Sequence, residues 1–330
     1  MIRILVTGAA GSVGSALVTE LLKNGNKVCA FDSSEDGLFK LREHIREQGL
    51  DSNLRDFLGD IRDLSRLNLA VDGCSEVYHC AALKHVGLCE YNPFEAVKTN
   101  IVGTNNIIEA CIKNNISKAI LTSSDKAVNP TSMMGSSKLV AEKLFISGNN
   151  IVGHNQTKFG VVRFGNVWDT NGSVGRIFAR QIRQNLNLTI TDKNMTRFFI
   201  DMNGALDLCQ YAMKEVIGGE IFTRSMGVTS IGKLAEEFLK NYPHISYKII
   251  GKKNGEKLYE ELFTDFEAHR TINIDNTYIT IPEQTNIGFQ LNEKIKNKYK
   301  DYPKCKKPLR SDDPDVLEID PKDLLKKIKI

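Results

Sequence analysis

The start of the chain carries the feature that constrains the fold most, an apolar run that ends in a glycine-rich turn. Residues 2–7 are mostly apolar, Gly8 follows, and a helical pattern begins at Ser12. A strand that enters a helix through glycines is typical of dinucleotide-binding folds, because a Cβ there would hold a pyrophosphate away from the backbone. The helix N-terminus adds free N–H groups and a positive dipole end. A tight turn without a ligand is the alternative. The predicted cofactor contacts in this turn are Gly8, Gly11, Ser12, Val13 and Gly14.

The first half of the chain repeats this unit. Short apolar runs alternate with helical patterns, as a parallel sheet requires. Strands are predicted at 2–7, 27–31, 55–58, 76–79, 118–122 and 159–163, and helices at 12–24, 92–115 and about 136–147. Gly25 would end the first helix, and Asn92 would cap the second. The predicted fold class is therefore α/β, with a Rossmann-like doubly wound parallel sheet.

In the second half of the chain, the regular alternation of strand and helix patterns ends. Glycine and asparagine are frequent at 165–175, and the elements that follow are shorter, with helices predicted at 174–184, 202–216 and 230–240. We expect a smaller C-terminal α/β lobe that closes over the strand ends. Residues 1–165 would form the NAD-binding domain, with a return near 196–222. Residues 166–195 and 223–330 would form the substrate-binding lobe.

Composition and charge narrow the class of protein. Apolar residues make up 41% and charged residues 25%, and neither a long apolar run nor a leader pattern is present, so we expect a cytoplasmic protein without membrane contact. The net charge of +4 does not favour a nucleic-acid partner. The basic stretch 294–310 is interpreted as solvated surface, with a polyanion site as the alternative. The 7 cysteines form no C-x-x-C pair, which predicts reduced thiols and no metal site.

Two acidic residues bear on the choice of cofactor. Asp32 ends the second strand, where a carboxylate accepts hydrogen bonds from the adenosine ribose and repels a 2′-phosphate. Ser33 and Ser34 follow it and supply no arginine, so NAD is favoured over NADP. Asp32 could instead cap the next helix. Asp60 and Ile61 are expected near the adenine, although their segment could also be only a loop with a helix cap.

The residues best suited to catalysis follow the fifth predicted strand. Ser124, Asp125 and Lys126 lie at its end, and Lys138 follows in the next helical pattern. Doubly wound folds bind ligands at the carboxyl ends of their strands. A carboxylate and two lysines gathered there would be costly to bury without a task. We therefore predict the catalytic centre here; a surface loop with a helix cap is the alternative.

With these motifs the sequence resembles the nucleotide-sugar 4,6-dehydratases of the extended short-chain dehydrogenase/reductase superfamily, and among them the UDP-N-acetylglucosamine 4,6-dehydratases. The resemblance covers nearly the whole chain. Besides the glycine turn and the Ser-Asp-Lys segment, the matching blocks are AALKHV at 81–86, EYNP at 90–93, RFGNV at 163–167, GSV at 172–174, MTRF at 195–198 and GEKL at 255–258.

The resemblance implies a role for each matching residue. Lys138 would bind the nicotinamide ribose, and Ser124 would hydrogen-bond the sugar 4-OH. Asp125 would protonate the departing 6-hydroxyl. Lys126 would take the C5 proton, with a pKa lowered by Lys138 and by burial. Arg197 would contact the diphosphate. The other implied cofactor contacts are Ala81, Ala82, Asn100 and Val167, and the other implied substrate contacts are Lys84, Asn166, Ser173, Val174, Thr191, Lys253 and Glu256.

Three positions depart from the family pattern. Met134 occupies the position of the superfamily's usual tyrosine, as in some branches of this dehydratase group. Because methionine cannot move a proton, the acceptor of the 4-OH proton is either Asp125 or a water held by Ser124. Ser124 itself replaces a threonine. Lys253 replaces an arginine, which keeps the charge but loses the bidentate fork.

The implied activity is an NAD-dependent 4,6-dehydration of a nucleotide-activated N-acetylhexosamine, most simply UDP-N-acetylglucosamine. C4 is oxidised, water is eliminated across C5 and C6, and the hydride returns to C6. A nucleotide-sugar epimerase and a non-catalytic NAD-binding regulatory protein are the alternatives, and a GDP-linked sugar is the alternative substrate. A homo-oligomer is implied by the resemblance alone.

Overall fold

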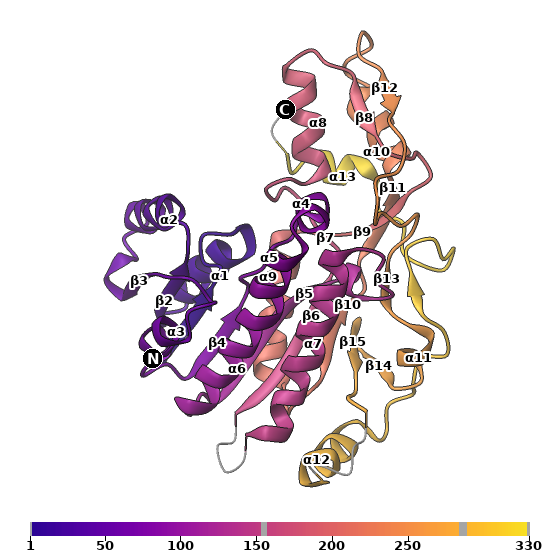
Figure 1. Ribbon diagram of the computed structural model, residues 1–330. Helices are drawn as coiled ribbons and strands as arrows, with labels where there is room; N and C mark the ends of the chain where they lie inside the picture. The colour runs from indigo at the N-terminus through magenta and orange to yellow at the C-terminus, as the bar shows by residue number, and fades with distance from the viewer. Residues whose placement is uncertain (1, 153–156, 284–288, 329–330) are drawn as a thin grey trace.

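One large sheet organises the molecule, of which the computed structural model describes residues 2–152, 157–283 and 289–328 (Figure 1). Its strand order is β14-β15-β10-β6-β5-β4-β1-β2-β3. Neighbouring strands from β3 to β10 are parallel, and β15 and β14 add an antiparallel edge. The predicted doubly wound α/β fold is confirmed. The strands are β1 (Arg3–Thr7), β2 (Lys27–Asp32), β3 (Leu54–Leu58), β4 (Glu76–His79), β5 (Lys118–Ser124), β6 (Lys158–Phe164), β10 (Ile221–Arg224), β14 (Thr271–Ile274) and β15 (Thr277–Thr280).

Both faces of this sheet are buried, which explains the nearly continuous apolar runs of its strands. In β1, Ile4 and Val6 face one core, whereas Leu5 faces the other. The first core includes α1 (Ser12–Lys23), α2 (Glu35–Glu47) and α9 (Met202–Glu215). The second includes α3 (Leu64–Val71), α6 (Gly103–Lys113) and α7 (Met133–Ile151).

The helix predicted at 92–115 is interrupted. It follows α4 (Val86–Tyr91) and consists of α5 (Pro93–Ala96), a π-helical turn (Val97–Val102) and α6. Asn92 does not cap α5, because its side-chain amide donates to the carbonyl oxygen of Leu88 at 3.1 Å. The expected cap is therefore wrong. The π-helical turn buries Asn100 against a loop of the cofactor region, in keeping with the frequent location of such turns near functional sites.

A smaller region lies beyond the end of the sheet where β4 leads into α4 (Figure 1). Its core contains Trp168, Phe178, Phe199 and Phe238. The predicted helices at 174–184, 202–216 and 230–240 are present as α8, α9 and α10. Of these three, only α9 packs against the large sheet. The elements of the smaller region are β7 (Asn166–Val167), α8 (Val174–Arg183), β8 (Leu188–Ile190), β9 (Thr196–Ile200), β11 (Gly227–Ser230), α10 (Ile231–Leu239), β12 (Tyr247–Ile249) and α13 (Pro321–Leu325).

The segments of the second half are divided between the large sheet and the smaller region differently from the predicted domain boundaries. β9 joins the smaller region, whereas α9 and β10 return to the large sheet. β14 and β15, expected in the lobe at 223–330, extend the large sheet, and Ile272 and Ile279 complete the core at that edge. This contact joins distant segments, so local pattern does not reveal it. The remaining elements are η1 (Asp51–Asn53), η3 (Asp125–Ala127), β13 (Glu261–Phe263), α11 (Asp265–Ala268), α12 (Phe289–Tyr299) and β16 (Leu309–Arg310).

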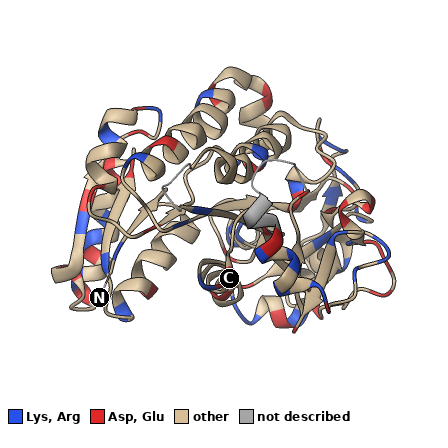
Figure 2. Ribbon diagram, turned by 90° about the horizontal axis from the view of Figure 1, so that it is seen from below, with Lys and Arg blue, Asp and Glu red and all other residues tan. Residues whose placement is uncertain are grey.

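Charged residues of both signs are interspersed along most elements (Figure 2). Within the basic stretch, Lys298 pairs with Glu215 at 3.0 Å, and Arg310 pairs with Asp312 at 2.8 Å. These acidic partners offset part of its charge, which favours the solvated-surface interpretation. The seven cysteines are free, as predicted.

Candidate active site

A cleft of about 960 Å³ opens at the carboxyl ends of the parallel strands and is closed on its other side by residues 164–174. The topology brings the loops after β1, β2, β4 and β5 to this edge, as expected for a doubly wound sheet. The predicted residues that line the cleft are Gly8, Gly11, Ser12, Val13, Gly14, Asp32, Asp60, Ile61, Ala81, Ala82, Lys84, Ser124, Lys126, Met134, Lys138, Asn166, Val167, Ser173 and Val174. The predicted residues outside its lining are Asn100, Asp125, Thr191, Arg197, Lys253 and Glu256.

The glycine turn forms one end of the cleft. Gly8 has a φ of +65°, and a Cβ at this position would lie 2.6 Å from the backbone nitrogen of Ala81. A Cβ on Gly14 would lie 2.1 Å from the carbonyl oxygen of Gly8. Among the residues that the structure describes, no side chain caps the N-terminus of α1 at Gly11. The turn therefore requires glycine and leaves backbone N–H groups available to an anion, so it fits a dinucleotide pyrophosphate.

Asp32 is oriented by the backbone around this turn. Its carboxylate accepts hydrogen bonds from the N–H groups of Ala10 and Ser34, both at 2.9 Å. Ser34, not Asp32, caps α2, because its hydroxyl accepts from the N–H of Gly37. The alternative that Asp32 is the helix cap is therefore wrong, and the residue lines the cleft as the ribose interpretation requires.

Asp60 lies further along the same end. It accepts a hydrogen bond from the backbone N–H of Arg62 and pairs with its guanidinium at 2.5 Å, and these contacts lower the pKa of Asp60. Asp63, not Asp60, caps α3. The sequence interpretation did not include Arg62, which also lines the cleft and pairs with Glu95 at 2.8 Å.

Asn100 lies behind the cleft wall instead of in it. Its amide accepts a hydrogen bond from the N–H of Leu83 at 2.8 Å and donates to the carbonyl oxygen of Leu83 and to Ser137. The residue thus holds the loop after β4 against α7. The structure gives Asn100 this supporting position, and its expected cofactor contact stays a prediction.

The catalytic segment bends sharply where β5 ends. The Oγ atom of Ser124 donates to Oδ1 of Asp125 at 2.8 Å, and Nζ of Lys126 donates to the same oxygen at 3.0 Å. Nζ of Lys126 also donates to Oδ1 of Asn166 at 3.2 Å. The short helix η3 brings these side chains to one point although they are adjacent in sequence. A hydroxyl, an acid and an amine therefore form one hydrogen-bonded group at the cleft.

The electrostatics of this group suit Asp125 as a proton donor and disagree with the lowered pKa expected for Lys126. Burial raises the pKa of Asp125, against the pull of Lys126. Burial alone would lower the pKa of Lys126, but the carboxylates of Asp125 and Glu260 outweigh it, so its pKa is raised. The lowered pKa expected for Lys126 is therefore wrong, because two carboxylates lie within 3.6 Å of its ammonium.

Glu260 is the functional candidate that the sequence interpretation missed. Its carboxylate is buried and faces Lys126 at 3.6 Å and Lys257 at 3.1 Å. The matching GEKL block ends at residue 258, so the only available signal was an acidic pair, Glu260 and Glu261, just beyond it.

Four expected substrate contacts lie apart from the cleft lining, namely Thr191, Arg197, Lys253 and Glu256. Arg197 is 8% exposed, and its guanidinium donates to the carbonyl oxygens of Thr196 and Lys257, both at 2.8 Å. The side chain of Glu256 accepts from the N–H of Lys253 within an exposed loop. The structure does not bring these groups to the cleft, so their substrate contacts stay predictions. The hydroxyl of Thr191 donates to the sulfur of Met195 at 3.2 Å, and its substrate contact also stays a prediction.

Lys138 and Met134 lie on the first turns of α7. Nζ of Lys138 donates to the carbonyl oxygen of Thr122 at 2.6 Å, and burial lowers its pKa to about 8. Met134 is buried beside Cys89 and Ala96 and forms part of the cleft wall. The position of the usual tyrosine is therefore filled by an apolar group, while the lysine is retained.

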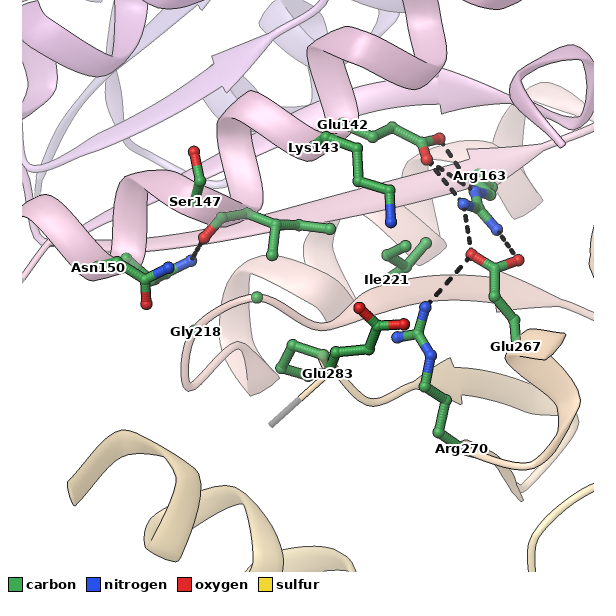
Figure 3. A pocket seen from close by; sticks show the side chains of 14 residues that line it. Glu142, Lys143, Ser147, Asn150, Arg163, Gly218, Ile221, Glu267, Arg270 and Glu283 are labelled. Atoms are coloured by element: carbon green, nitrogen blue, oxygen red, sulfur yellow. Dashed lines mark hydrogen bonds and ion pairs between the residues drawn. The ribbon is translucent and has the colours of Figure 1, made fainter. Parts of the chain in front are cut away.

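A chain of buried ion pairs begins at Glu142 and continues through Arg163 and Glu267 (Figure 3). Glu142, one turn along α7, partly restores the pKa of Lys138 that burial lowers. Nη2 of Arg163 lies 2.7 Å from Glu142 and 2.9 Å from Glu267. Arg270 follows at 3.8 Å from Glu267 and lines a second cavity of about 150 Å³. This chain fixes the back of α7 to β6 and α11.

Several buried polar atoms at the cleft have no hydrogen-bond partner within the part of the chain that the structure describes. They are Ser123 Oγ, Trp168 Nε1 and Ser173 Oγ in the lining, and Oδ2 of Asp125, which lies behind the lining residue Ser124. Buried polar atoms are usually paired, so this lining is suited to a polar ligand. Across the described ranges, no group of His, Cys, Asp or Glu side chains could hold a metal ion.

The fold and the cleft define a protein of the extended short-chain dehydrogenase/reductase class. A family model described as a polysaccharide biosynthesis protein matches residues 4–282. The chain therefore belongs to the polysaccharide biosynthesis protein family, and the resemblance to nucleotide-sugar 4,6-dehydratases is confirmed.

Three relatives illustrate the range of the family. An inverting UDP-N-acetylglucosamine 4,6-dehydratase of Campylobacter jejuni is 36% identical over 330 residues, 96% of each chain. An uncharacterized membrane protein of Methanocaldococcus jannaschii is 43% identical over 288 residues, 84% of this chain and 85% of the relative. A UDP-glucose 4-epimerase of Rickettsia rickettsii is 34% identical over 281 residues, 83% of this chain and 81% of the relative. In the described part of this chain, no helix is both long and apolar enough to cross a membrane.

Solved structures agree on the fold. The protein Pen from Bacillus thuringiensis superposes with a TM-score of 0.88 at 36% identity, over 100% of this chain and 98% of that one. A dTDP-glucose 4,6-dehydratase of Streptomyces venezuelae, solved with NAD bound, superposes with a TM-score of 0.69 at 20% identity, over 78% of this chain and 87% of that one.

Proposed function

We propose that the protein is an NAD-dependent dehydratase that converts UDP-N-acetylglucosamine into a 4-keto-6-deoxy sugar nucleotide. The observation that carries the proposal is the contact of 3.0 Å between Lys126 Nζ and Asp125 Oδ1 at the cleft. Elimination of water needs a base for the C5 proton and an acid for the 6-hydroxyl, and epimerisation at C4 needs neither. The Campylobacter dehydratase that aligns with 96% of this chain supports the same activity.

The cofactor end of the cleft fits NAD. The glycine turn would bind the pyrophosphate, Asp32 the adenosine ribose and Lys138 the nicotinamide ribose. NAD supplies, when bound, the hydride acceptor for C4 and the hydride donor for C6. NADP is the less suitable cofactor because the carboxylate of Asp32 would repel a 2′-phosphate. The NAD bound to the Streptomyces dehydratase is in keeping with this choice.

Asp125 can carry the proton that leaves the 4-OH group to the 6-OH group. The hydroxyl of Ser124 lies between the cleft and Asp125, to which it donates at 2.8 Å. The 4-OH proton would pass through Ser124 to the carboxylate of Asp125 as C4 is oxidised. The protonated acid, whose pKa burial raises, would then donate to O6 so that water leaves. This route needs no tyrosine, which accounts for the tolerance of Met134.

Lys126 would remove the C5 proton once the 4-keto group has made it acidic. Asn166 accepts a hydrogen bond from Nζ of Lys126 at 3.2 Å and helps to orient it. Lys126 must be neutral to accept a proton, and the ammonium that then forms returns the proton to C5. The O4 proton ends in the released water, so no net proton is gained or lost by the side chains.

The alternatives rest on specific observations. The Rickettsia relative named a UDP-glucose 4-epimerase favours an epimerase. Met134 favours a non-catalytic NAD-binding protein, although Asp125, Lys126 and Lys138 are all present. A GDP-linked sugar is the alternative substrate. Cytoplasmic location and homo-oligomeric assembly stay predictions.

The purified protein is incubated with UDP-N-acetylglucosamine and NAD, and the product is followed by mass spectrometry and NMR. We expect loss of the mass of one water and a new C6 methyl signal, and the C5 coupling gives the stereochemistry. An unchanged mass with an inverted C4 would indicate an epimerase. If neither the UDP-linked nor a GDP-linked sugar gives a product, the result would indicate the non-catalytic NAD-binding regulatory protein.

A further inference from the structure

Glu260 has no role in the reaction described so far, although its carboxylate lies beside the base. We propose that Glu260 is a positioning residue for the proposed dehydration: it holds the side chain of Lys126 beside Asp125 and stabilises the ammonium that forms when Lys126 takes the C5 proton. The inference rests on the proposed function. It deepens that function by naming a residue that helps Lys126 to accept a proton.

Segments that are far apart in the sequence meet at Glu260. Its side chain is 3% exposed, and Oε1 lies 3.6 Å from Nζ of Lys126 and 3.8 Å from Nε of Arg197. Oε2 lies 3.1 Å from Nζ of Lys257. The N–H of Glu260 donates to the hydroxyl of Ser311 at 2.9 Å, which fixes the backbone just before β13. The carboxylate is therefore held in place from several sides.

The surrounding charges keep this carboxylate ionised. Burial alone would raise the pKa of Glu260, but three cations outweigh it and hold the pKa below its ordinary value. In the described part of the chain, the charged groups that act on Glu260 and Lys126 are Arg197 from β9, Lys257 from the loop before β13, and Asp125. Lys126 thus shares the charge of Glu260 with Arg197 and Lys257, whereas Asp125 is its nearer carboxylate at 3.0 Å.

The same network joins the catalytic segment to the smaller region. Lys257 also donates to the carbonyl oxygen of Val128 at 2.8 Å, and Arg197 donates to the carbonyl oxygen of Lys257. Arg197 therefore has a structural partner in Lys257, and its contact with the diphosphate stays a prediction. The position of Lys126 thus depends on contacts from both parts of the molecule.

The test is the pH dependence of kcat for Glu260→Gln in the full chain. Glutamine keeps the shape and removes the charge, so an ammonium at Lys126 is less stable. The limb on which kcat rises with pH should move to lower pH by about one unit, as expected for loss of an opposite charge at this distance. KM for UDP-N-acetylglucosamine should change by less than about twofold, since Glu260 lies outside the lining of the cleft. A merely structural role would lower kcat without moving the limb.

Two variants serve as controls. Glu261→Gln removes the adjacent carboxylate, which accepts a hydrogen bond from Asn129 at 2.6 Å and does not pair with Lys126 or Lys257. The rising limb of the pH profile of kcat should therefore stay in place in this variant. Lys257→Met removes a cation beside Glu260 and should move the limb to higher pH. If Glu260→Gln does not fold, Lys257→Met decides alone: a limb that stays or moves to lower pH overturns the proposal.

A second readout separates this inference from the proposed function. The labelling of Lys126 by acetic anhydride is measured against pH by mass spectrometry, and it reports the titration of the amine without turnover. If the wild-type protein dehydrates no nucleotide sugar, the proposed function fails, and this titration still tests the role of Glu260. A midpoint that is lower in Glu260→Gln supports the proposal, and an unchanged midpoint overturns it.

Discussion

Nζ of Lys126 lies 3.0 Å from Oδ1 of Asp125, so the two residues that we propose as base and acid of a water elimination are consecutive and share a hydrogen bond. Consecutive side chains in a strand point to opposite faces of the sheet. Here the strand ends at Ser124, and the short helix η3 turns both side chains toward the same site. The chemistry therefore depends on where β5 ends as much as on which residues follow it.

The first prediction concerns pH. The pKa of Lys126 is raised above its ordinary value, so its ammonium dominates at neutral pH, whereas the reaction needs the neutral amine. We expect kcat to rise from neutral to mildly alkaline pH by about tenfold per unit, the slope of one required deprotonation. Steady-state kinetics with saturating substrate measures this slope. A flat profile would show that a step without Lys126 limits turnover.

The second prediction concerns the base itself. Lys126→Ala should lower kcat by about 10²–10⁴-fold, the range for one proton-transfer group, and leave NAD and substrate binding in place. Turnover assays and calorimetric titrations with NAD and UDP-N-acetylglucosamine separate the two effects. Lys84→Ala is the matched lysine variant, because its ammonium lines the cleft but donates to the carbonyl oxygen of Asn171, and it should raise KM more than it lowers kcat. Near-normal turnover of Lys126→Ala would contradict the assignment.

The third prediction concerns the cofactor. Burial lowers the pKa of Lys138 to about 8, so its ammonium is present below that pH and is lost above it. NAD affinity should therefore fall as pH rises through about 8 if Lys138 binds the nicotinamide ribose. Calorimetry across this range measures the change, and Lys138→Arg, which keeps its charge, should remove the pH dependence. An affinity of the wild-type protein that is constant through this range would exclude the role.

The fourth prediction concerns stability. Arg163 is 2% exposed and is held between Glu142 and Glu267, so Arg163→Met leaves two buried carboxylates without their cation (Figure 3). The free energy of unfolding should fall by about 3–5 kcal/mol, as for other broken buried ion pairs. Denaturant titration measures it. Arg46→Met removes an exposed pair with Glu43 and should cost less than about 1 kcal/mol. Equal effects of both variants would contradict the buried-network interpretation.

The sequence predicted the first half of the fold well because its signals are local. Residues 76–79 form a strand as predicted, and the first helix runs from Ser12 to Lys23, one residue short of its prediction. The glycine turn was also predictable from the sequence. The positive φ of Gly8 and the close approach of Gly14 to the carbonyl oxygen of Gly8 require glycine at both positions.

Long-range contacts account for what the sequence did not reveal. β14 and β15 lie in the range expected for the lobe, yet β15 pairs with β10 and β14 pairs with β15, so both extend the large sheet. The pKa of Lys126 was expected to be lowered because Glu260, 134 positions further along the printed sequence, could not be placed beside it. The fold also brings together the carbonyl groups that accept the hydrogen bonds of Arg197, whose diphosphate contact stays a prediction. Such partners follow only from the folded chain.

The most direct test of the proposed function is the fate of the hydrogen on C4. UDP-N-acetylglucosamine carrying deuterium at C4 is incubated with the protein and NAD, and the label is located by NMR. The proposed dehydration predicts a 4-keto product with the deuterium in its C6 methyl group. Deuterium that remains at C4 of a sugar with inverted C4 configuration would contradict it and indicate an epimerase.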